Sequence, residues 1–141
     1  MANDMYDVIV VGAGNAALCA ALSAHEHGAR VLVLERAPRE KRGGNSAFTS
    51  GSFRMVHHGL PDISKVIPDL SADEIAKTDF GVYTREQFLD DLARVTQYNT
   101  DPDLAETLVD NSTGTVQWIK KTTSLRFVPM YGRYAFKHND R

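Results

Sequence analysis

The chain has 141 residues, 43% of them hydrophobic, which is enough to bury the core of one domain-sized globular protein. Its formal net charge of −2, with acids and bases interspersed, gives no electrostatic reason to expect binding to nucleic acid or to an anionic membrane. A single cysteine excludes an internal disulfide, and without a membrane-length apolar run or a signal peptide pattern we expect a cytoplasmic protein.

The first 35 residues carry the pattern of a strand, a helix and a second strand. Residues 6–11 form a continuous apolar run with β-branched residues, which is typical of a strand buried on both faces of a parallel sheet. Alanine and leucine predominate from Gly14 to His27, and Gly28 stands at the expected C-terminal stop of a helix. Residues 30–35 repeat the buried-strand pattern, which predicts a βαβ unit with a right-handed crossover.

The middle of the chain gives weaker signals. Residues 36–46 are polar and contain glycine, which predicts a loop, and its length suggests a functional role. Residues 51–79 have mixed polarity and contain Pro61 and Pro68, which indicates irregular structure or short elements without defined bounds.

Two amphipathic helices are predicted over residues 84–123. Thr84 and Gln87 have the spacing of a capping box, and Phe88, Leu92 and Val95 then fall on one face of a helix that ends near residue 98. Asp101 followed by proline predicts a second helix start.

The second helix has one apolar stripe and one weak point. The stripe consists of Leu104, Leu108, Val109, Val116 and Ile119. Gly114 costs about 1 kcal/mol relative to alanine, so a break at this position is an open alternative. Residues 125–136 indicate the beginning of a strand or hairpin.

A glycine motif joins the first strand to the first helix. Residues 12–17 read G-x-G-x-x-A, the dinucleotide-binding fingerprint with alanine in the third place. Gly12 allows the sharp turn, Gly14 lets a diphosphate approach the main chain, and Ala17 lets helix and strand pack closely. Glu35 ends the second strand, where an acid accepts hydrogen bonds from ribose hydroxyls; a solvated charge is the alternative.

Two further groups of residues and a single arginine follow Glu35 as candidates for the site. Gly43-Gly44-Asn45-Ser46 permits close approach of the main chain to a phosphate, although these residues by themselves fit a plain turn equally well. The basic residues of segment 36–42 either lie in a solvated loop or approach the adenosine or phosphates. Arg54 either approaches the cofactor or a substrate carboxylate, or forms a surface ion pair.

The stretches DVIVVGAGNAALCAALSAHEHGARVLVLERAP and RGGNSAFTSGSFR together resemble the flavoprotein subunits of the succinate dehydrogenase and fumarate reductase family. Within that family the sequence looks like the FAD-dependent tricarballylate dehydrogenases, and YTREQFLDDLARVTQY and DPDLAETLV support this likeness. The resemblance implies a Rossmann-like α/β fold with a parallel sheet, followed by helices, and FAD as the cofactor.

The resemblance also assigns site residues. It implies that the diphosphate is cradled by Gly12, Gly14, Asn15 and Ala16, and that the adenosine ribose is met by Glu35 and Arg36. It also implies a second flavin-contacting loop, formed by Gly43, Gly44, Asn45, Ser46, Gly51 and Ser52. Respiratory members carry a histidine at the position of Asn45 that bonds covalently to the flavin, so we expect non-covalent FAD here. Ser52 replaces a more usual glycine, which leaves the approach of the flavin at this position in question.

The resemblance implies the oxidation of tricarballylate to cis-aconitate, with a tricarboxylate or dicarboxylate substrate and electrons leaving through a membrane-bound iron–sulfur and haem partner. From the charge and the residues themselves, we expect no nucleic-acid partner and no metal. Members of that family are much longer, so we expect residues 1–141 to be an incomplete, N-terminal FAD-binding domain that is inactive alone, with its unknown catalytic residues beyond Arg141. Its parts would be a dinucleotide unit (1–35), a flavin-loop region (36–60) and a helical segment (84–123).

Two alternatives to this flavoprotein reading stay open. One is an NAD-dependent or generic dinucleotide-binding module in which Gly43-Gly44-Asn45-Ser46 is only a turn. The other is a non-catalytic remnant that keeps the fold without turnover.

Overall fold

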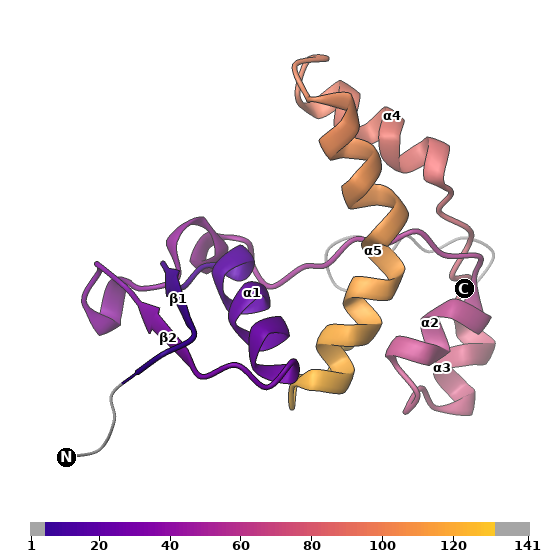
Figure 1. Ribbon diagram of the computed structural model, residues 1–141. Helices are drawn as coiled ribbons and strands as arrows, with labels where there is room; N and C mark the ends of the chain where they lie inside the picture. The colour runs from indigo at the N-terminus through magenta and orange to yellow at the C-terminus, as the bar shows by residue number, and fades with distance from the viewer. Residues whose placement is uncertain (1–4, 132–141) are drawn as a thin grey trace. The chain divides into compact units, whose positions relative to one another are not determined.

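The computed structural model describes residues 5–131, and the chain divides into two compact units, Met1–Ser52 and Phe53–Arg141. In the described part, the first unit contains two strands, one α-helix and two short 3₁₀ helices, and the second contains four α-helices (Figure 1). This arrangement is the α/β fold that the sequence predicted.

The first unit is a βαβ unit. Strand β1 (Val8–Val11) pairs in parallel with strand β2 (Val31–Leu34), Val8 lying opposite Val31, and helix α1 (Asn15–Glu26) contacts both strands. Gly28, with φ +85°, follows the C-cap of α1, where a left-handed residue ends a helix at low cost. The prediction of a strand, a helix and a parallel strand is confirmed, with both strands shorter than expected.

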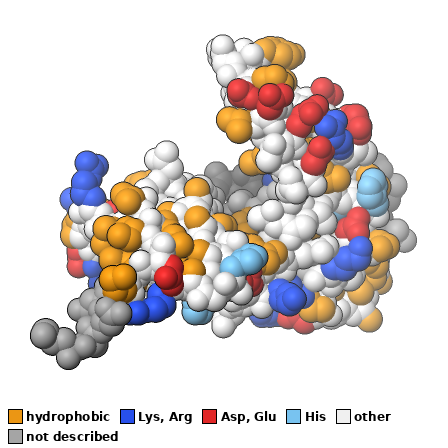
Figure 2. Space-filling view, viewed as in Figure 1, with side chains coloured by type: hydrophobic (Ala, Val, Ile, Leu, Met, Phe, Trp, Pro, Cys, Tyr) orange, Lys and Arg blue, Asp and Glu red, His pale blue; other side chains and the backbone are white. Residues whose placement is uncertain are grey.

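The prediction that these strands are buried on both faces is wrong for this structure. Side chains along β1 alternate between partly buried and exposed, and Val11 is 82% exposed. Every buried residue within 5–131 lies in the second unit. A two-stranded sheet with one helix covers too little apolar surface to form a core of its own, and Figure 2 shows hydrophobic side chains gathered on the surface over β1 and β2.

The segment after β2 contains more structure than the predicted loop. Two 3₁₀ helices, η1 (Arg39–Lys41) and η2 (Gly44–Phe48), lie in it, and Gly43 precedes η2 with φ +101°. Single 3₁₀ turns are too short to give a periodic apolar pattern, so composition alone identified only a loop.

Two of the four helices of the second unit lie within residues 51–79, where the sequence indicated irregular structure or short elements without defined bounds. Helix α2 (Leu60–Val66) has a proline in its first turn, and helix α3 (Ala72–Lys77) has a capping box formed by Ser71 and Glu74. Both helices are short, and their residues show too few apolar repeats to be recognised by periodicity.

The other two helices begin where the sequence predicted. Helix α4 (Arg85–Val95) starts at Thr84, whose side chain accepts the Gln87 N–H at 3.2 Å. Helix α5 (Pro102–Thr122) starts at Asp101 and continues through Gly114 without a break. We attribute this continuity to burial on both sides of Gly114, which offsets the cost of about 1 kcal/mol for glycine.

The core of the second unit lies against α5. Met55, Val66 and Val116 form a buried cluster, and Val109 and Ile119 of the predicted stripe are also buried. The outer members of the predicted faces are exposed instead, because each helix is covered along only part of its apolar side; these residues are Val95, Leu104 and Leu108.

The end of the described chain differs from the expectation. Residues 125–131 form no strand, and the rest of the predicted strand or hairpin, 132–136, lies outside the described residues. No helix within residues 5–131 has the length and apolarity required to cross a membrane.

Candidate functional site

The first glycine loop (residues 12–17) turns the chain from β1 into α1. The Gly12 N–H donates to the Leu34 carbonyl at 2.6 Å, and the residue has φ +106°, a conformation that L side chains rarely adopt. Gly14, by contrast, has φ −80° and ψ 177°, which any residue tolerates. Its lack of a side chain therefore matters for the space above it rather than for its backbone conformation.

The space above Gly14 belongs to the second glycine loop (residues 43–46). A Cβ on Gly14 would lie 3.4 Å from the Gly43 carbonyl oxygen and 3.5 Å from Ser46 Oγ. Ser46 Oγ accepts the Asn15 N–H at 3.0 Å. Because the hydroxyl accepts this bond, its own hydrogen stays available for a further acceptor. The structure thus brings together the two loops that the sequence assigned to the diphosphate and the flavin.

The N-terminus of α1 is suited to an anion. The N–H groups of Ala16 and Ala17 lie in the first turn, where no intrahelical acceptor exists, and neither has a partner among residues 5–131. This turn contains no acidic residue, so no side chain of the turn itself opposes the positive end of the helix dipole. Two unpartnered donors beside a glycine cradle fit the diphosphate of a dinucleotide.

Glu35 lies beside this cradle, and its carboxylate accepts main-chain hydrogen bonds. Its Oε2 accepts the Ala13 N–H at 3.0 Å and its Oε1 accepts the Ala37 N–H at 2.8 Å. These bonds, that from Ala37 foremost, hold the pKa of the Glu35 carboxyl below its usual value. The carboxylate therefore fixes the main chain of the first glycine loop. Each oxygen keeps a second lone pair with which to accept a ribose hydroxyl.

The remaining predicted site residues lie around the second loop. Asn45 lies within η2, and Arg36 follows Glu35; both side chains are exposed. Gly51 and Ser52 belong to a separate turn, the candidate flavin turn (residues 49–52), closed by the Ser52 N–H donating to the Thr49 carbonyl at 3.4 Å. Within the described residues, no group of three or more His, Cys, Asp or Glu could hold a metal ion.

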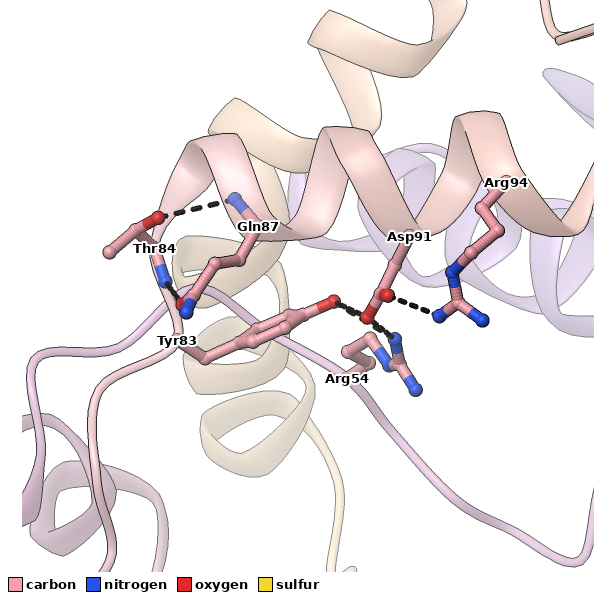
Figure 3. Close-up of polar contacts among 6 residues, drawn as sticks. All are labelled: Arg54, Tyr83, Thr84, Gln87, Asp91 and Arg94. Carbon is pink, nitrogen blue, oxygen red and sulfur yellow. Dashed lines mark hydrogen bonds and ion pairs between the residues drawn. The ribbon is translucent and has the colours of Figure 1, made fainter.

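Arg54 forms an ion pair, one of its two predicted alternatives, within a polar cluster of the second unit (Figure 3). Arg54 Nη1 donates to Asp91 Oδ2 at 2.6 Å and to the Tyr83 hydroxyl at 2.9 Å, and that hydroxyl donates to Asp91 Oδ2 at 2.7 Å. Arg94 donates to the other carboxylate oxygen at 2.6 Å and is the main reason that the pKa of Asp91 is lowered. Sequence reasoning missed these partners because Tyr83 and Asp91 lie far from Arg54 along the chain.

Taken together, the fold and the two loops define a dinucleotide-binding unit of the strand–glycine loop–helix type. Residues 7–140 match the family described as FAD binding domain. The chain therefore belongs to the FAD-binding flavoproteins, in the succinate dehydrogenase and fumarate reductase family, and FAD is the cofactor of its site.

Known relatives agree with this assignment. The chain is 32% identical, over 84% of its length, to the vinyl phenol reductase of Lactiplantibacillus plantarum. It is 29% identical to the NADH:fumarate oxidoreductase of Klebsiella pneumoniae over 81% of its length, and 29% identical to the fumarate reductase (cytochrome) of Shewanella frigidimarina over 83%. These matches cover 20%, 10% and 18% of the respective relatives, so the chain spans a small part of their length.

Proposed function

We propose that the whole protein is a flavin-dependent oxidoreductase that oxidises tricarballylate to cis-aconitate. The observation that carries the flavin part of this proposal is the hydrogen bond from the Asn15 N–H to Ser46 Oγ at 3.0 Å. It joins the diphosphate-binding loop to the loop assigned to the flavin. The tricarballylate part rests on the sequence resemblance, and the reductases among the relatives favour related chemistry at an activated carbon–carbon double bond.

Each group of residues has a role in this proposal. The Ala16 and Ala17 N–H groups and the Ser46 hydroxyl bind the diphosphate, while Gly14 keeps the main chain accessible to it. Glu35, with Arg36, meets the adenosine ribose. Asn45 provides no nucleophile for a covalent bond to the flavin, so the cofactor is held non-covalently.

Bound FAD would supply the redox chemistry by accepting a hydride from a carbon next to a carboxylate-bearing carbon, while a proton leaves the neighbouring carbon and a double bond forms. The described residues bind and orient the cofactor. In this proposal the electrons would leave through a membrane-bound iron–sulfur and haem partner, with the protein itself in the cytoplasm.

The test begins with the full-length protein purified without added flavin. We expect flavin absorbance, complete release of the flavin into the filtrate after denaturation, and bleaching of the absorbance when tricarballylate is added without oxygen. A colourless protein that takes up no FAD would overturn the assignment. Bleaching by succinate but not by tricarballylate would keep the enzyme class and reject the substrate, and flavin retained after denaturation would contradict non-covalent binding.

A further inference from the structure

Two side chains from later in the first unit hold the first glycine loop on either side of Gly14. Before Gly14, the Ala13 N–H donates to Glu35 Oε2 at 3.0 Å. After Gly14, the Asn15 N–H donates to Ser46 Oγ, also at 3.0 Å. The loop is therefore fixed at two points, and the residue between them is the one without a side chain.

These bonds divide the N–H groups of the loop into two sets. Those with an acceptor in the protein belong to Gly12, Ala13 and Asn15. Those without an acceptor among residues 5–131 belong to Gly14, Ala16 and Ala17. Unpartnered N–H groups that gather at the start of a helix bind anions. The first set thus determines the shape of the loop, and the second set is available to the diphosphate.

The Glu35 carboxylate joins the first glycine loop to the chain that leads into the second one. While Oε2 accepts the Ala13 N–H, Oε1 accepts the Ala37 N–H at 2.8 Å. The N–H groups of Ala37, and after it of Ala13 and Gly43, lower the pKa of this carboxyl, which favours the ionised form that accepts hydrogen bonds with both oxygens. One side chain therefore sets the position of Ala13 relative to the segment after β2.

We propose that Glu35 is a positioning residue for the FAD diphosphate, holding Ala13 so that the free N–H groups of the first glycine loop converge on the anion; this inference rests on the proposed function. A single pair of backbone dihedrals separates the Ala13 N–H from the Gly14 N–H, so a shift of the first turns the second. The role is separate from the ribose contact, because it predicts that an anion without any ribose also depends on Glu35.

Charge and geometry make opposite predictions for such an anion. A carboxylate beside the loop repels a diphosphate, so its removal would tighten anion binding if charge alone governed the affinity. Glu35→Gln removes the charge and keeps the shape, but the amide accepts with one oxygen and presents an NH₂ group to the other N–H. The same amide still forms a hydrogen bond with a ribose hydroxyl. Loss of affinity for an anion without a ribose therefore reports the position of the loop.

Glu40 provides a matched control. It is an exposed acid in η1, a few residues after Glu35, and it has no hydrogen bond or ion pair with the first glycine loop among residues 5–131. Glu40→Gln removes the same charge from the same segment and leaves the Ala13 N–H with its acceptor. Its effect on anion affinity measures the contribution of net charge.

The experiment compares the full-length, flavin-free wild-type protein with Glu35→Gln and Glu40→Gln, well below the Tm of each. FAD is titrated by flavin fluorescence, and inorganic pyrophosphate and ADP are measured by competition against FAD. We expect Glu35→Gln to raise the dissociation constant of pyrophosphate about fivefold, the effect of losing one hydrogen bond, and those of ADP and FAD by at least as much. Glu40→Gln should change all three by less than about twofold.

Each outcome decides the inference. If wild-type protein binds no FAD, the proposed function fails and this inference fails with it. If FAD binds but pyrophosphate at millimolar concentration does not displace it, the loop is no preformed anion cradle and only this inference fails. Pyrophosphate affinity that is unchanged or tighter in Glu35→Gln, or equally weakened in Glu40→Gln, also rejects the positioning role.

A second variant keeps the test decisive should Glu35→Gln not fold. Glu35→Asp retains the charge, but its side chain is one methylene shorter and cannot reach the Ala13 and Ala37 N–H groups together. We expect it to weaken pyrophosphate binding while the charge beside the loop stays the same. Unchanged pyrophosphate affinity in this variant would equally reject the positioning role.

Discussion

Two glycines of the same loop should respond in opposite ways to an added methyl group. At Gly12 the backbone has φ +106°, while the added Cβ would meet only the Ala17 Cβ, at 3.9 Å. The cost of Gly12→Ala is therefore conformational, about 1–3 kcal/mol of the free energy of unfolding. At Gly14 the backbone suits alanine, and the nearest atoms lie at 3.4 and 3.5 Å, which is ordinary contact. Gly14→Ala should leave stability within about 0.5 kcal/mol of wild type.

The two substitutions should rank the other way in their effect on FAD affinity. The Gly14 methyl group would stand between the two glycine loops, over the main chain that the diphosphate approaches. We expect the FAD dissociation constant of Gly14→Ala to rise at least about tenfold, which corresponds to about 1.4 kcal/mol. Gly14→Ala should therefore give a stably folded protein that binds FAD weakly, whereas Gly12→Ala should lose stability even without flavin.

Gly28→Ala is the matched control. Gly28 has φ +85° and no atom within 4 Å of its added Cβ, and it lies at the opposite end of α1 from the loops. This variant should lose about 1–2 kcal/mol of stability with unchanged FAD affinity. The assay is urea unfolding of flavin-free protein followed by circular dichroism, together with FAD titration. The reasoning is refuted if Gly14→Ala destabilises as much as Gly12→Ala, or binds FAD as tightly as wild type.

Three further predictions address single interactions. Thr84→Ala removes the acceptor of the Gln87 N–H and should cost about 1 kcal/mol in thermal unfolding; an unchanged Tm would mean that the cap contributes nothing. Gly51→Ala meets no neighbouring atom within 4 Å, so its expected loss of about 1–2 kcal/mol in urea unfolding comes from φ +69° alone, and full stability would contradict this. Because the folded-state pKa of Glu35 is lowered, its stabilisation is present above its usual pKa of 4.5 and is lost as pH falls through the folded value. Glu35→Gln should therefore unfold more easily than wild type at pH 7 but not at strongly acidic pH. An equal difference in stability between the two proteins at both pH values would show that the charged carboxylate of Glu35 is not the source of the stabilisation.

The features predicted correctly from the sequence depend on local physical chemistry. Gly12 has a conformation that few other residues tolerate, and it follows a β-branched run, so the strand and the loop identify each other. Asp101 followed by proline marks the start of α5 because both residues suit the first turn of a helix irrespective of what packs there. Caps and turns are short-range interactions, which a pattern of a few residues can contain.

The features that were missed depend on distant residues. Asn15 and Ser46 are 31 positions apart, and nothing in either loop specifies which hydroxyl accepts which N–H. The exposure of Val11 is set by how many strands cover the sheet, not by the sequence of β1. The capping box of Ser71 and Glu74 is an exception, because it has the same form as that of Thr84 and could have been recognised.

Ser112 lies outside every motif but holds the main chain at Val56, and this leads to a last prediction. It lies between Val109 and Val116 on the buried side of α5, is 8% exposed, and donates to the Val109 carbonyl at 2.7 Å while accepting the Val56 N–H. Ser112→Ala leaves that N–H without an acceptor, which should cost about 1–3 kcal/mol in urea unfolding and speed hydrogen exchange at Val56. Thr115→Ala, exposed on the same helix, should change stability by less than about 0.5 kcal/mol. Equal effects of the two substitutions, with unchanged exchange at Val56, would show that the main chain around Val56 does not depend on this hydroxyl.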